Sequence, residues 1–156
     1  MRRTRVRTLV AVAVGVAAVG TLLLRLLETR GVYLPGAAWV EVVALVLIAG
    51  LVLWAGWAVR AYLRGEKPDL DPLRAARTFA MAKAAAYTGA LLTGRYAASV
   101  LLVLPQLAVE PRREVAITSG VAALAAIGLA VVGLVVEKFC EAPPPEEDEG
   151  REAIPS

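Results

Sequence analysis

Four apolar stretches dominate this chain and limit what it can fold into. They cover residues 9–27, 37–59, 79–104 and 115–136. A helix of about 20 residues crosses the roughly 30 Å hydrocarbon core of a bilayer, so each stretch is long enough to span it. None alternates as a strand does, and all are rich in the small and aliphatic residues of membrane helices. We therefore predict an all-α integral membrane protein, a four-helix bundle formed by residues 1–140.

The overall composition agrees with this prediction and excludes an ordinary soluble domain. Hydrophobic residues make up 58% of the chain, the mean hydropathy is +0.65, and the charged residues cluster between the apolar stretches. No segment between the stretches is long enough for an independent soluble domain. Residues 141–156 are rich in proline and acidic residues, which cannot bury enough apolar surface to order themselves. We expect them to form a disordered acidic tail.

Basic residues predict the orientation in the membrane, because they concentrate on the cytoplasmic side. Nine of them flank one side, namely Arg2, Arg3, Arg5, Arg7, Arg60, Arg64, Lys67, Arg74 and Arg77. Four flank the other side, namely Arg25, Arg30, Arg112 and Arg113. We predict that both termini are cytoplasmic, and that the basic inner loop between the second and third spans meets anionic lipid headgroups. A cleaved signal peptide is the competing interpretation of the first stretch, but its apolar run continues past any small-residue cleavage site.

The third stretch differs from the others because it carries two cationic side chains, Lys83 and Arg95. A charge at the centre of a membrane helix costs about 2.5–3.5 kcal/mol on insertion scales. The two residues lie about 120° apart around a helix, which argues against one anion site built from both. Their partners at matching depth are Glu137 for Lys83 and Glu41 for Arg95. Ion pairing, snorkelling to lipid phosphates and contact with a bound or transported ligand all remain open.

Small residues recur at every fourth position of the third stretch, forming a ridge of Ala82, Ala86, Ala90, Gly94 and Ala98. Such a ridge lets a neighbouring backbone approach closely, which is how helices associate within lipid. We expect the ridge to pack inside the bundle. The alternative is a seam for a homo-oligomer or for another membrane protein.

Signatures of catalysis are missing from the sequence. The chain has no histidine and one cysteine, Cys140, and no glycine-rich phosphate loop follows a strand,. We expect no catalytic residues, no metal, no cofactor and no nucleic-acid partner. The favoured function is a non-enzymatic accessory or scaffold protein. The main alternative is a small transporter or permease component that uses Lys83 and Arg95 for an anionic solute, and a membrane enzyme acting on a lipid is a weaker one.

Two segments, 67–94 and 136–149, resemble an actinobacterial family of small four-span membrane proteins, the domain of unknown function 3180 family. The matching residues are Asp71-Pro72, Ala75-Ala76-Arg77, Ala82-Lys83-Ala84 and the run Glu137 to Cys140 before the acidic tail. The resemblance implies a multi-pass protein of the bacterial cytoplasmic membrane. It makes Lys83 a motif position, leaves Arg95 without a counterpart, and implies no activity, catalytic residue or ligand.

Overall fold

Four long helices account for nearly all of the chain that the computed structural model describes, which is residues 5–31, 37–63 and 72–139. They are α1 (Val6–Glu28), α2 (Trp39–Leu63), α3 (Pro72–Val103) and α4 (Glu110–Phe139), with a 3-10 turn (Leu104–Gln106) after α3. Within the described residues there is no strand. Each of the four helices is long and apolar enough to cross a membrane. The predicted all-α membrane bundle is confirmed.

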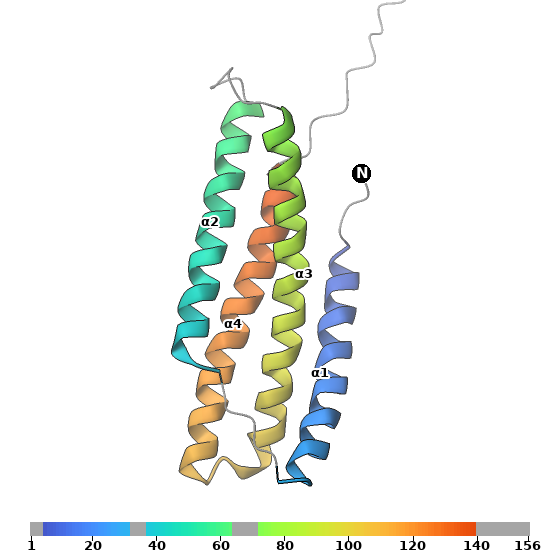
Figure 1. Cartoon of the computed structure of the whole chain (residues 1–156), viewed down its shortest axis with the longest axis vertical. Coiled ribbons are helices and arrows are strands. Elements are labelled where there is room, and N and C mark those ends of the chain that lie inside the picture. The colour runs from blue at the N-terminus through green and yellow to red at the C-terminus, as the bar shows by residue number, and fades with distance from the viewer. Residues whose placement is uncertain (1–4, 32–36, 64–71, 140–156) are drawn as a thin grey trace, which may run out of the picture.

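The helices alternate in direction, so the bundle has two distinct ends (Figure 1). We call the end where α1 and α3 finish and α2 and α4 begin the loop end. The opposite end, where α1 and α3 begin and α2 and α4 finish, is the termini end. The acidic tail, Cys140, Asp71 and most of the basic inner loop lie outside the described residues.

The helices and the predicted spans have different bounds. α3 already begins at Pro72 and α4 at Glu110, well before the apolar runs that start at residues 79 and 115. Pro111 lies in the first turn of α4, where a proline costs no helical hydrogen bond. α2 begins two residues after the predicted position 37, at Trp39. The differences arise because hydropathy marks the part of a helix that suits hydrocarbon, while caps and prolines decide where the helix ends.

α3 and α4 pack with their backbones in close contact. A Cβ atom on Gly89 would lie 2.6 Å from the amide nitrogen of Ala130, and one on Gly133 would lie 2.6 Å from the carbonyl oxygen of Ala82. Only glycine permits this approach. Along the two facing helices, Leu129 and four alanines are fully buried, namely Ala82, Ala86, Ala122 and Ala126. This seam forms the centre of the bundle.

The remaining helices lie on either side of that seam, in the order α2, α4, α3, α1 (Figure 1). α1 packs on α3, where a Cβ on Gly94 would lie 2.5 Å from the carbonyl oxygen of Ala13. α2 packs mainly on α4, with Gly56 against Val136, and to a lesser extent on α3. Within the described residues α1 has no backbone contact with α2 or α4. α3 is therefore the helix that all the others touch.

The two outer helices expose large apolar side chains along most of their length. Examples exposed by more than half are Leu22, Val40, Leu47, Leu51 and Trp54. Patches of this extent are rare on proteins that face water, but they are what a lipid-facing surface requires. The exposed faces of α1 and α2 thus fit the membrane character of the fold.

Candidate functional site at the loop end

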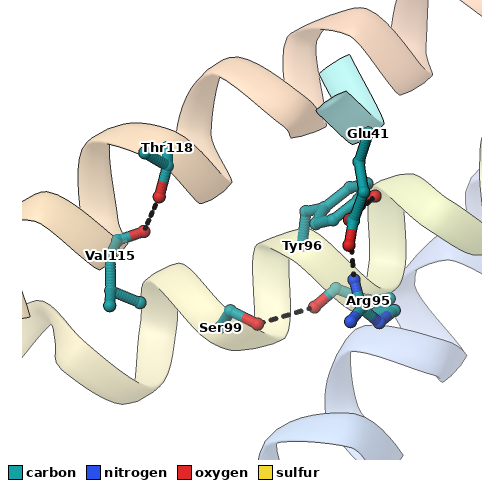
Figure 2. Close-up of polar contacts among 6 residues, drawn as sticks. All are labelled: Glu41, Arg95, Tyr96, Ser99, Val115 and Thr118. Atoms are coloured by element: carbon teal, nitrogen blue, oxygen red, sulfur yellow. Dashed lines mark hydrogen bonds and ion pairs between the residues drawn. The ribbon is translucent and has the colours of Figure 1, made fainter. Parts of the chain in front are cut away.

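The polar side chains of α2 and α3 meet at the loop end. Glu41, in the first turn of α2, lies opposite Arg95 and Tyr96 of α3 (Figure 2). The Tyr96 hydroxyl donates a hydrogen bond of 2.7 Å to Oε2 of Glu41. Nη1 of Arg95 lies 3.7 Å from the same oxygen. The structure therefore brings together two of the four charged residues that the sequence singled out, Glu41 and Arg95.

Burial differs sharply within this group. Tyr96 is buried, whereas the side chains of Arg95 and Glu41 are 50% and 43% exposed. The guanidinium carbon of Arg95 lies 5.1 Å from the centre of the Tyr96 ring, within the range of a cation–π contact,. Buried Tyr96 thus holds both neighbours: its hydroxyl orients the carboxylate of Glu41 and its ring face contacts Arg95.

The contact between Arg95 and Glu41 is electrostatic. A separation of 3.7 Å is an ion pair but is too long for a hydrogen bond,. Ser99 donates a hydrogen bond of 3.4 Å to the Arg95 carbonyl oxygen (Figure 2). Arg95 lies about 12 Å along α3 from Val103, at 1.5 Å per residue. The group can anchor a charge near one face of the membrane.

The other two predicted charged residues lie at the termini end. Glu137 of α4 is 3% exposed, and Lys83 of α3 is half-buried. The contact of Gly133 with Ala82 and Ala86 sets the register of α3 against α4. In this register, Lys83 and Glu137 lie at neighbouring levels of the seam. Their pairing stays a prediction, and Arg95 belongs to a separate group at the loop end.

The small-residue ridge of α3 lies inside the bundle and contacts two different helices. Ala82 and Ala86 face Gly133 of α4, whereas Gly94 and Ala98 face α1. Ala90 packs in a cluster with Ala86 and with Leu9 of α1. All five residues of the ridge are buried, so its two halves are occupied by helices of the same chain.

Three polar residues at the loop end were not predicted from the sequence as members of a site. Arg112 of α4 donates a hydrogen bond of 2.9 Å to Glu28 of α1. Ser119 of α4 is fully buried, and its hydroxyl has no hydrogen-bond partner in the described part of the chain. Tyr96 follows Arg95 directly in the sequence, which is the one local signal that was available. The Arg112 contact has no such signal, because it joins helices far apart in the chain.

Metal binding is not suggested by the arrangement of acidic side chains. Across residues 5–31, 37–63 and 72–139, no three carboxylate or cysteine side chains gather closely enough to hold an ion. The contacts described above are ion pairs and hydrogen bonds between helices. Buried alanine, glycine and Leu129 pack along the seam between α3 and α4.

The fold and these contacts define a multi-pass α-helical membrane protein with ion pairs and hydrogen bonds between its helices. Within that class, the chain belongs to the family described as protein of unknown function (DUF3180), whose family profile matches residues 9–144. Comparison with curated proteins and with solved structures gives no match.

Proposed function

We propose that this protein is a non-enzymatic accessory or scaffold protein of the bacterial cytoplasmic membrane. The observation that carries the proposal is the packing of α3 against α4. Their backbones touch at Gly89 and Gly133, and buried alanines and Leu129 pack along the two helices there. A solute pathway along this seam needs a polar cavity, whereas backbone contact and buried apolar side chains close this part of the seam.

The separation of the charged residues also supports a scaffold over a transporter. Lys83 and Arg95 lie in opposite halves of α3, and buried Ala86 and Ala90 of the same helix lie between them. An anionic solute bound by both cations would have to bridge that packed region. Charges placed in this way suit anchoring at two membrane faces.

The outer helices provide the surfaces that a scaffold needs. α1 and α2 form the two edges of the bundle and expose continuous apolar faces. At the termini end, Arg77 and Lys138 are exposed, and the Arg60 guanidinium lies 4.4 Å from the Phe139 ring centre. With both termini cytoplasmic, as the basic residues predict, this end meets anionic headgroups of the inner leaflet.

In-cell photocrosslinking tests the proposal. A photoreactive amino acid replaces one exposed leucine at a time: Leu22 on α1, Leu47 on α2 or Leu124 on α4. A scaffold should give a stoichiometric adduct with another membrane protein from one of these faces and none from the other two, because a specific partner covers one face. Adducts shared equally by all three faces indicate random collision and contradict the proposal. Uptake of an anion by proteoliposomes, lost on Lys83→Gln or Arg95→Gln, favours the transporter instead.

A further inference from the structure

A cavity of about 510 Å³ opens at the loop end, between the first turn of α2 and the first turns of α4. It is distinct from the Glu41–Arg95–Tyr96 group. Its lining combines one aromatic, three charged and three smaller side chains, namely Trp39, Glu110, Pro111, Arg113, Glu114, Ile117 and Thr118. The mixture of charge, aromatic surface and apolar surface at a helix end is what an amphiphile requires of its binding site.

Within residues 5–31, 37–63 and 72–139, the charged lining residues form no ion pairs. Glu110, Arg113 and Glu114 lie three and four positions apart, on one face of α4. In the described part of the chain, Arg113 forms no ion pair with either glutamate, whereas its neighbour Arg112 is paired with Glu28. Two carboxylates four positions apart on a helix repel each other, and a cation held between them removes that repulsion.

The other lining residues complement both charges of a zwitterion. Trp39 is 59% exposed and faces the cavity from α2, so its ring is available for a cation–π contact with an ammonium group. Arg113 supplies the planar donor that binds a phosphate. With two carboxylates and one guanidinium, the lining carries a net negative charge, which disfavours a purely anionic headgroup.

From the cavity toward the termini end, exposed apolar side chains continue along α4 and form a track. Ile117, Leu124 and Val131 are exposed at heptad spacing. Gly120 and Gly128 lie between them, and a Cβ at either glycine would meet nothing within 4 Å. Because Ile117 also lines the cavity, the track starts where the charged groups end. It offers a shallow path for an acyl chain.

We propose that this cavity binds the headgroup of a phospholipid that carries a primary ammonium, as phosphatidylethanolamine does. The ammonium lies between Glu110, Glu114 and the Trp39 ring, the phosphate contacts Arg113, and one acyl chain follows the track on α4. The stabilising effect of acidic residues at a helix N-terminus accounts for the two glutamates. It does not account for the open cavity, for Trp39 or for Arg113. The inference stands apart from the scaffold proposal.

Tryptophan quenching by brominated lipids tests this site directly. In a full-length variant carrying Trp54→Phe and Trp57→Phe, Trp39 is the only tryptophan; both replaced residues are exposed. The protein is reconstituted with brominated phosphatidylethanolamine, phosphatidylcholine or phosphatidylglycerol at equal mole fractions. We expect the ethanolamine lipid to quench Trp39 at the lowest mole fraction, because its ammonium donates hydrogen bonds that a quaternary ammonium cannot. Replacing Glu110 and Glu114 by Gln should raise the mole fraction of ethanolamine lipid needed to quench Trp39 about tenfold. A tenfold change corresponds to the loss of about one charge-assisted hydrogen bond.

A matched control keeps the other two tryptophans and removes Trp39 by Trp39→Phe. Trp54 and Trp57 lie on an exposed apolar face of α2, so the three lipids should quench them equally. Equal quenching of Trp39 by all three lipids, or a preference for phosphatidylglycerol, overturns the proposal. If the variant with both Gln substitutions fails to fold, the quenching of Trp39 by the three lipids in the protein that retains Glu110 and Glu114 still tests the proposal.

Discussion

Nη1 of Arg112 lies 2.9 Å from Oε1 of Glu28, and the two side chains are only 24% and 27% exposed. This contact joins α4 to α1, although the described residues show no backbone contact between these helices. Apart from this bridge, α1 is held by its packing on α3. The ion pair is therefore a second attachment for the helix with the fewest neighbours.

Replacing Arg112 by Gln should loosen the end of α1 with little effect on global stability. A partly exposed ion pair contributes about 1 kcal/mol or less. Hydrogen exchange should rise for backbone amides near Glu28 and stay unchanged in α3 and α4. Arg113→Gln is the matched control, since Arg113 forms no ion pair in the described part of the chain. Equal exchange in the two variants would show that the Arg112 bridge does not hold α1.

Alanine substitutions at glycines should separate close packing from open surface. Gly89→Ala and Gly133→Ala place a Cβ against the opposing backbone, and overpacking of this kind costs about 1–3 kcal/mol. At Gly128, nothing lies within 4 Å of an added Cβ, so Gly128→Ala should be neutral or stabilising by up to about 1 kcal/mol. Thermal unfolding in detergent, followed by circular dichroism, measures the difference. Similar midpoints for all three variants would contradict the described α3–α4 seam.

Charge reversal at Arg95 should be rescued by reversal at Glu41. Arg95→Glu places a second carboxylate beside Glu41, and the repulsion should lower the yield of folded protein. Adding Glu41→Arg restores opposite charges at the two positions, which form an ion pair of 3.7 Å in the unsubstituted protein, so the double variant should recover. Tyr96→Phe, which removes the 2.7 Å hydrogen bond to Glu41, should cost about 1 kcal/mol. Failure of the double variant to recover more than either single variant would exclude a pairwise interaction.

Lys83 and Glu137 should show stronger coupling than Arg95 and Glu41. Glu137 is 3% exposed, while Glu41 has a side chain that is 43% exposed. Removing one partner of a buried pair costs about 3–5 kcal/mol, because the remaining charge stays buried. A double-mutant cycle built from Lys83→Gln and Glu137→Gln measures the coupling free energy. A coupling near zero would favour snorkelling of Lys83 to the headgroups.

Cysteine labelling can establish the predicted orientation. In a Cys140→Ser background, Ala38→Cys reports on the loop end, where Ala38 is exposed just before α2. The unsubstituted protein reports through Cys140, its single cysteine. A membrane-impermeant maleimide should label Ala38→Cys in intact cells and Cys140 only after permeabilisation. The reverse pattern would place both termini outside.

The sequence predicted which segments are membrane helices, because long apolar runs mark them. It predicted the positions of the helix ends less well. A run of apolar residues long enough for the hydrocarbon core leaves helix as the only way to satisfy its backbone, so the class of α1 to α4 followed locally. The start of α4 at Glu110 could not be predicted in this way. Pro111 can mark the end of a loop, and it can equally occupy the first turn of a helix.

For the site, the sequence by itself determined that Arg95 and Glu41 match in depth, since depth depends only on distance along each helix. The tertiary structure decided the rest. It placed Tyr96 between them, joined Arg112 to Glu28, and divided one ridge of small residues between α4 and α1. These contacts depend on the rotation and order of neighbouring helices, and such packing is set by interactions between distant segments, which no local pattern encodes.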